Sequence, residues 1–211
     1  MLVDLTVREL LERVASAEPV PGGGSMAALC AALAAGLAEM VARLTVGRRK
    51  DSALDHEMNQ LIDRAQALRG DLTRAVDLDS DAYTKVMVAY RMPKTTNEEK
   101  LLRSEAIQEA LKEAARVPLA VAEMAVDALE LASLAVSKGN KNAVTDGLAS
   151  ALMARSAVMT AAANVRVNLQ GITDEAFVRK AQTRTELLEK KALAAEEMIR
   201  SWAQPLVTGG G

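Results

Sequence analysis

A carboxylate interrupts the apolar stripe of a long predicted helix. Over residues 51–90, apolar side chains recur at alternating intervals of three and four, which is the spacing of a buried seam in a helical bundle. The seam calls for an apolar residue near position 79, but the sequence has Asp79, and Tyr83 follows one turn later on the same stripe. A partly desolvated aspartate has a raised pKa and suits acid–base chemistry, whereas an aspartate held by a lysine or a backbone donor would fit the pattern equally well. Asp77 and Asp81 fall off the stripe and are expected to face solvent.

A glycine-rich loop precedes another predicted helix. Gly22, Gly23 and Gly24 stand between Pro21 and Ser25, so backbone N–H groups are brought to a helix N-terminus, where they can bind an anionic group. The loop lacks the lysine of a phosphate-binding loop and follows no predicted strand, which argues against a nucleotide site. It can serve a carboxylate-bearing ligand, or it can simply turn the chain tightly into a crowded helix.

A second polar stripe lies on the helix predicted after Gly139. Steps of three and four residues place small and polar side chains on one face, at Asp146, Ser150, Met153, Ala157, Ala161, Asn164 and Asn168. Such a face can line a cleft or form a hydrogen-bonded contact between helices. Asp146 is also favoured in a first helical turn by the helix dipole alone.

The chain offers few metal ligands and few redox groups. It has one histidine, His56, and one cysteine, Cys30, so neither a histidine-based metal site nor a Ser-His-Asp triad can be assembled. Cys30 lies in an apolar run and is expected to be a small buried side chain. We therefore expect no metal and no intramolecular disulfide.

Helix signals account for nearly the whole chain. Apolar spacing, capping boxes at Thr6 and Thr96, and glycine and proline breaks predict helices over about 6–17, 25–45, 51–90, 96–117, 118–137, 143–170 and 173–203. Ser25 is the expected N-cap of the second helix, and Pro118 is expected to open a separate one, since proline is tolerated in a first turn. The glycine tail after Pro205 is expected to be frayed. The prediction is a single all-α domain spanning residues 1–211, an antiparallel bundle of six or seven helices with long central helices.

The composition of the chain limits which classes of binding partner are expected. Among 211 residues, 26 basic and 28 acidic side chains nearly cancel, so no strong field attracts nucleic acid or an anionic membrane, and neither partner is expected. The longest uncharged apolar run, 26–38, is shorter than a membrane span needs. Charged residues interrupt the first ten positions, so no signal peptide is expected and the cytoplasm is the predicted compartment.

These motifs, in this order, resemble the cyclodeaminase/cyclohydrolase family, which comprises the C-terminal half of formiminotransferase-cyclodeaminase and its stand-alone bacterial relatives. The resemblance covers nearly the whole chain, and its most specific segments are Pro21–Ser25 with Ala27-Ala28, Gly36–Val41, Asp79–Tyr83, Pro93–Thr95 with Glu99-Lys100, Gly139–Asn142 with Thr145-Asp146, and Asn164–Leu169. The chain has Thr145 where the family usually has serine, which keeps the hydroxyl.

The resemblance implies an all-helical homodimer with a folate cleft near its interface, a tetrahydrofolate derivative as substrate, and no other cofactor. It also implies site roles: Asp79 as the first acid–base group, Asp146 as the second carboxylate, and the remaining groups as orienting or proton-handling side chains, namely Lys94, Tyr83, Asn140, Asn164 and Asn168. Gly22, Gly23, Gly24 and Ser25 would hold the substrate or shape the cleft, and the cations at residues 48–50 could attract its glutamate tail.

The resemblance leaves the reaction open. No formiminotransferase domain is expected in this chain, which favours hydrolysis of 5,10-methenyltetrahydrofolate to 10-formyltetrahydrofolate. The alternative is cyclodeamination of 5-formiminotetrahydrofolate to 5,10-methenyltetrahydrofolate and ammonia by the same residues. A second alternative is a non-catalytic folate-binding or helical dimerisation protein.

Overall fold

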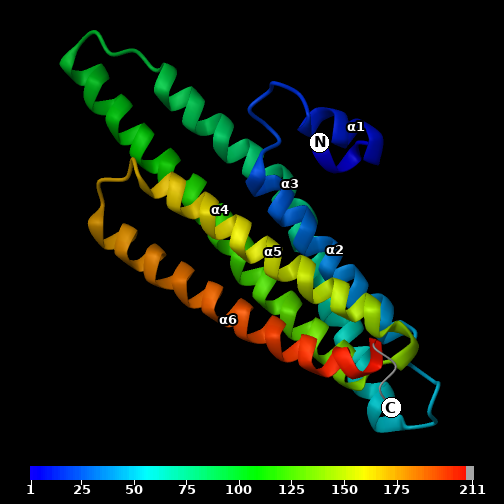
Figure 1. The fold of residues 1–211 in the computed structure, drawn as a ribbon. Helices are drawn as coiled ribbons and strands as arrows, with labels where there is room; N and C mark the ends of the chain where they lie inside the picture. The colour runs from blue at the N-terminus through cyan, green and yellow to red at the C-terminus, as the bar shows by residue number, and fades with distance from the viewer. Residues whose placement is uncertain (208–211) are drawn as a thin grey trace.

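The computed structural model describes residues 1–207, and its long helices run up and down beside one another (Figure 1). In chain order the elements are the short 3₁₀ helix η1 (Leu2–Asp4), α1 (Val7–Val14), α2 (Gly23–Arg43), α3 (Ser52–Arg91), α4 (Asn97–Lys138), the 3₁₀ helix η2 (Lys141–Ala143), α5 (Val144–Leu169) and α6 (Glu175–Val207). No strand forms within residues 1–207, so the predicted all-α bundle is confirmed, with six α-helices. The expected fraying of the glycine tail concerns residues outside this range.

Alanine is the main material of the core. α4 packs against all four other long helices, and the side chains it buries are mostly alanine, valine and leucine. In α2, seven alanines between Ala27 and Ala38 are buried. Small side chains let helix backbones approach closely, and two hydrogen bonds mark this closeness: Ser150 Oγ donates to the Ala34 carbonyl at 2.7 Å, and Cys30 Sγ donates to the Met153 carbonyl at 3.3 Å. The middle of the polar stripe on α5 is therefore a contact between helices.

Pro118 does not end a helix. α4 runs unbroken through it, so the prediction of a helix boundary at residues 117–118 is wrong. Proline has no N–H and leaves the carbonyl four residues earlier without its helical partner. Here that carbonyl belongs to Ala114, and Asn168 Nδ2 of α5 donates to it at 2.6 Å. A side chain from a neighbouring helix thus replaces the missing backbone bond. α6 likewise continues through Pro205 to Val207, beyond the predicted end.

Two of the three predicted N-caps form. Thr6 and Thr96 both close complete capping boxes, with Glu9 and Glu99 respectively. Ser25 is not a cap: α2 begins two residues earlier, with Gly22 as an N-cap that has no side chain to contribute. The free backbone N–H groups at the N-terminal end of α2 therefore need hydrogen-bond acceptors from another part of the fold.

α1 lies to one side of the bundle (Figure 1) and buries none of its residues. The chain ahead of it is anchored by Asp77 of α3, whose Oδ1 accepts a hydrogen bond from the Leu2 backbone N–H at 2.6 Å. The other oxygen of Asp77 is buried without a hydrogen-bond partner in the described residues. The expectation that Asp77 faces solvent is wrong, while Asp81 is exposed as predicted.

Candidate functional site

A cleft of about 190 Å³ lies where α2 begins, walled by three other helices and the loop before α2. Its lining combines polar groups with small apolar ones: Pro19, Val20, Gly22, Gly23, Gly24, Asp79, Ala82, Tyr83, Val86, Ala114, Asn164 and Asn168. Asp79, Tyr83, the three glycines, Asn164 and Asn168 were all predicted site residues from distant parts of the sequence. The fold brings these seven together.

The carboxylate of Asp79 covers the N-terminal end of α2. Ser25 Oγ donates to Asp79 Oδ2 at 3.0 Å, and the Ser25 backbone N–H also donates to this carboxylate. A negative charge at this position stabilises the helix dipole and supplies the acceptor that Gly22 lacks. The N–H groups expected to bind an anionic ligand are thus partly engaged by a carboxylate of the protein itself.

Gly24 is required by this arrangement. A Cβ on Gly24 would lie 2.5 Å from Asp79 Cγ and closer still to its Oδ1, distances that no real Cβ keeps. Glycine is therefore needed for the approach of α3 to α2. This gives the glycine loop a physical role that its sequence alone left open.

Burial raises the pKa of the Asp79 carboxyl above its usual range, and the two hydrogen bonds from Ser25 offset only part of that effect. Desolvation penalises the charged form of the carboxyl, whereas hydrogen bonds to the carboxylate favour it. Asp79 shows a feature of each alternative that the sequence left open, because it is held by hydrogen bonds from Ser25 and its pKa is raised by burial.

The two asparagines differ in how much of their side chain is engaged. Asn164 Nδ2 donates to the Thr160 carbonyl at 2.9 Å and lies against Gly23. Asn164 lines the cleft, and its amide oxygen makes no hydrogen bond with residues 1–207, so this oxygen has the capacity to accept one from a ligand. Asn168 already donates to the Ala114 carbonyl, so its contribution to ligand binding is secondary to its structural one. Tyr83 projects from α3 at the rim, with 37% of its surface exposed.

Four predicted site residues do not line this cleft: Ser25 is fully buried beside it, where it donates to Asp79, and the other three lie elsewhere. Asp146 is in the first turn of α5, eighteen residues before Asn164, which is about 27 Å at a helical rise of 1.5 Å per residue. Asn140 caps η2 beside it and accepts a hydrogen bond from Asn142 N at 3.1 Å. Lys94 is exposed in the loop that follows α3. Within one chain, Asp146 and Asn140 lie at the opposite end of α5 from the cleft, and Lys94 is not among the cleft's lining residues.

Ser80, which was not a predicted site residue, also belongs to this arrangement. Its hydroxyl lies 3.2 Å from Ser25 Oγ, so Ser80, Ser25 and Asp79 form a connected polar group at the start of α2. In the sequence, Ser80 lies next to Asp79 within the Asp79–Tyr83 segment of the family resemblance, and nothing else there marked it as a site residue.

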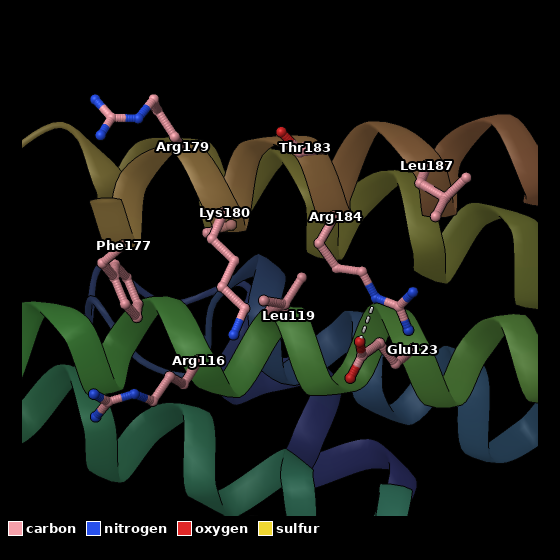
Figure 2. Close-up of a pocket in the computed structure, with 10 residues that line it drawn as sticks. Arg116, Leu119, Glu123, Phe177, Arg179, Lys180, Thr183, Arg184 and Leu187 are labelled. Carbon is pink, nitrogen blue, oxygen red and sulfur yellow. Dashed lines mark hydrogen bonds and ion pairs between the residues drawn. The ribbon is translucent and has the colours of Figure 1, made fainter. Parts of the chain in front are cut away.

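A larger groove, of about 780 Å³, lies between α4 and α6. Figure 2 shows its cationic side chains, with Lys180 pointing from α6 toward α4 and Arg184 reaching across to Glu123. Glu123 is held by Arg184 at 2.6 Å, and Arg116 is paired with two glutamates of its own helix. Because its one carboxylate is committed to an ion pair, this groove is less suited to proton transfer than the cleft at Asp79. Within residues 1–207, no group of three metal-ligating side chains gathers in either place or elsewhere.

Comparison with known proteins points to one kind of protein. The family model described as formiminotransferase-cyclodeaminase matches residues 6–187. The chain is 38% identical over 194 residues to the methenyltetrahydrofolate cyclohydrolase of Methylorubrum extorquens, which covers 92% of this chain and 93% of the relative. It is 36% identical over 198 residues to the formimidoyltransferase-cyclodeaminase of Rattus norvegicus, but spans only 37% of that longer protein. The crystal structure of formiminotetrahydrofolate cyclodeaminase from Thermotoga maritima superposes with a TM-score of 0.88 at 28% identity, covering 98% of this chain and all of the other.

Proposed function

This chain belongs to the formiminotransferase-cyclodeaminase family, and on that premise we propose that it is an enzyme of one-carbon folate metabolism that hydrolyses 5,10-methenyltetrahydrofolate to 10-formyltetrahydrofolate. The observation that carries the proposal is Asp79, a desolvated carboxylate that lines a cleft and has a raised pKa. The relative that matches nearly end to end has the name of a cyclohydrolase, which favours this reaction over cyclodeamination.

The arrangement suits attack on a cationic carbon. In the methenyl substrate one carbon bridges two nitrogens and carries delocalised positive charge, which a nearby carboxylate stabilises. Asp79 accepts a proton from the attacking water, and a tetrahedral carbon forms. The bond to N5 then breaks as N5 gains a proton, and the new hydroxyl loses its proton to become the carbonyl of the formyl group on N10, so of the two protons of water one ends on N5 and one is released. A carboxylate with a raised pKa is the stronger base for the first step.

The other cleft groups would position the substrate. Asn164 offers an amide oxygen, and Tyr83 offers a hydroxyl at the rim. The cleft is smaller than the roughly 300–1,000 Å³ typical of ligand sites, so it fits the reacting rings and not a whole folate. The glutamate tail must extend outside it. The predicted cations Arg48, Arg49 and Lys50 are exposed, but they follow the C-terminal end of α2, about 31 Å along that helix from the cleft, so within one chain they lie too far away to attract the tail.

Cyclodeamination of 5-formiminotetrahydrofolate is the second candidate, favoured by the likeness to the Thermotoga maritima cyclodeaminase. There the tetrahedral carbon forms by ring closure and ammonia leaves, with the same carboxylate handling protons. The deciding experiment supplies purified protein with each substrate separately. One arm follows the decay of methenyltetrahydrofolate absorbance, corrected for spontaneous hydrolysis, and the other follows ammonia release. An Asp79→Asn variant is the matched control. Folate binding without turnover of either substrate would leave only the non-catalytic alternative.

The proposal extends to the working state of the enzyme. We propose a homodimer that acts in the cytoplasm without a metal or an added cofactor, because hydrolysis at a carbon that is already cationic needs neither redox nor Lewis-acid chemistry. The near balance of 26 basic and 28 acidic side chains supports a small-molecule substrate over nucleic acid or a membrane. Dialysis against a chelator should therefore leave turnover unchanged, and restoration of lost turnover by a divalent metal would contradict this point.

A further inference from the structure

Two serine hydroxyls form a hydrogen-bonded chain that begins at the Asp79 carboxylate. Ser25 Oγ donates to Asp79 Oδ2 at 3.0 Å, and Ser80 Oγ lies 3.2 Å from Ser25 Oγ. Ser25 is fully buried, so solvent does not interrupt the chain at its middle member. A serine hydroxyl has one proton to donate and two lone pairs that accept. Each serine can therefore take a proton from one neighbour while it gives its own proton to the next.

The outer end of this chain reaches a second cavity. Ser80 lines a cavity of about 680 Å³ between α3 and the N-terminal segment, which we call the α1 cavity, whereas Asp79 lines the substrate cleft. Most of the residues that line the α1 cavity are exposed, so water has access to it. Its lining side chains include four carboxylates and one arginine, a balance that favours a positive charge: Glu9, Glu12, Glu18 and Asp77 against Arg13.

The proposed hydrolysis needs an exit for one proton. Asp79 takes a proton from the attacking water, passes it to N5, and then takes the proton of the new hydroxyl, so it ends each turnover protonated. While the product stays bound, its rings fill the cleft of about 190 Å³ and leave little room for water on that side. Burial raises the pKa of the Asp79 carboxyl, so the proton is held more firmly there than on an exposed aspartate. A proton that stays on Asp79 is available to the reverse reaction.

We propose that Ser25 and Ser80 relay this proton from Asp79 to water in the α1 cavity. The inference rests on the proposed function. Asp79 Oδ2 gives its proton to Ser25 Oγ, the Ser25 hydroxyl proton moves to Ser80 Oγ, and the Ser80 hydroxyl proton moves to a water molecule. Each serine loses one O–H bond and gains another, the carboxyl becomes a carboxylate, and hydronium leaves through the α1 cavity. Ser25 then donates to Asp79, as in the structure, and rotation of the two hydroxyls restores the starting arrangement.

Ser80 is the better position for a test. Ser25 holds the Asp79 carboxylate directly, so its removal would alter the base itself, whereas Ser80 acts on Asp79 only through Ser25. Valine and threonine at position 80 form a matched pair, because the two side chains have nearly the same shape and differ by one hydroxyl. Ser80→Ala adds no atom, so it tests the same loss of the hydroxyl if the valine variant does not fold.

The relay predicts a difference between repeated and single turnovers. Ser80→Val should lower the steady-state kcat for methenyltetrahydrofolate by roughly 10-fold, less than the about 10²–10⁴-fold that an acid–base group contributes, because the proton can still leave after the product does. KM and the single-turnover rate, measured with enzyme in excess, should stay unchanged, since Asp79 begins that turnover unprotonated. Ser80→Thr restores the hydroxyl and should recover most of the loss.

A control variant removes a hydroxyl from the same helix without touching the relay. Thr73 Oγ1 donates to the Arg69 carbonyl one turn earlier on α3, and Thr73→Val should keep wild-type kcat. Circular dichroism on each preparation shows that the variants are folded.

Three results would overturn the relay in an active enzyme. The first is a Ser80→Val protein with wild-type steady-state turnover. The second is an equal loss in steady-state and single-turnover rates, which would indicate a displaced Asp79 and not a slow proton exit. The third is a Ser80→Thr protein as slow as Ser80→Val, which would show that side-chain size decides. A wild-type protein that does not hydrolyse methenyltetrahydrofolate would instead refute the proposed function on which the relay rests.

Discussion

Replacing Gly24 by alanine is the most direct perturbation of the Asp79 arrangement, because it changes no charged or polar group. The added methyl would occupy space that the Asp79 carboxylate now fills, with 2.5 Å to its Cγ. All of the close contacts are with the Asp79 carboxylate, so the side chain can give way only by rotating that carboxylate away from α2. We expect the carboxylate to leave the end of α2 and to lose its hydrogen bonds with Ser25.

The size of the effect follows from two opposing contributions. Alanine in place of glycine favours a helix by up to about 1 kcal/mol. A hydrogen bond to a charged group contributes about 1.5–3 kcal/mol, and loss of that bond would outweigh the gain. The free energy of unfolding should therefore fall by about 1–2 kcal/mol, which for a chain of this size lowers Tm by about 2–8 °C. Turnover should fall as well, because the same carboxylate is the proposed base.

Gly36→Ala is the matched control, since it makes the same change in the same helix. Its Cβ would meet only Arg69 Cδ, at an ordinary 3.5 Å, so the control should keep wild-type turnover and gain up to about 1 kcal/mol in stability. Calorimetry and turnover are measured on the same preparations of both variants. A Gly24→Ala protein with unchanged Tm and turnover would refute the close approach of Asp79 to α2 and the role built on it.

The remaining predictions address the base and the proline. Asp79→Asn should lower turnover by about 10²–10⁴-fold with a smaller effect on folate affinity, and near-normal turnover in the folded variant would contradict the assignment. Because burial raises the pKa of Asp79 above its ordinary 3.8, the base becomes protonated earlier on acidification; kcat/KM should fall at a higher pH than an exposed aspartate would give, and the Asn variant should lack this limb. Asn168→Ala should cost about 1–3 kcal/mol by leaving the Ala114 carbonyl unpaired, and Pro118→Ala in that background should recover much of the loss by restoring the helical N–H; equal stability of the single and double variants would show that the carbonyl is not the cause.

Local sequence features determined the helices and several of their ends. Thr6 and Thr96 cap as their spacing predicts, because a capping box involves residues only three positions apart. The place of Asp79 on the buried side of α3 also followed from spacing alone, because helical periodicity decides which face a residue occupies. These are properties of one helix and its nearest neighbours along the chain.

Contacts between helices decided the rest. By its local sequence, Pro118 is predicted to start a helix. In the structure the helix continues through it, because Asn168, fifty residues later, donates the hydrogen bond that the Ala114 carbonyl would otherwise lack. Helical spacing predicts that Asp77 faces solvent. In the structure the N-terminal segment lies against it, and the Leu2 backbone N–H donates a hydrogen bond to its carboxylate. In both cases a hydrogen-bond partner comes from far along the chain, and no local pattern specifies it.

For the candidate site, too, the sequence determined one part and the packing of the helices determined another. The resemblance of the sequence to a folate-enzyme family implied the kind of substrate, and seven of the predicted residues line one cleft. The sequence did not show that Gly24 exists to admit the Asp79 carboxylate, because that requirement depends on how closely α2 and α3 approach. Nor did it show that Asp146 stands a helix length away from Asp79, since stripe membership gives the face of a helix but not the distance between points on different helices. Periodicity fixes direction around a helix axis, whereas only tertiary packing sets the separations between helices that chemistry requires.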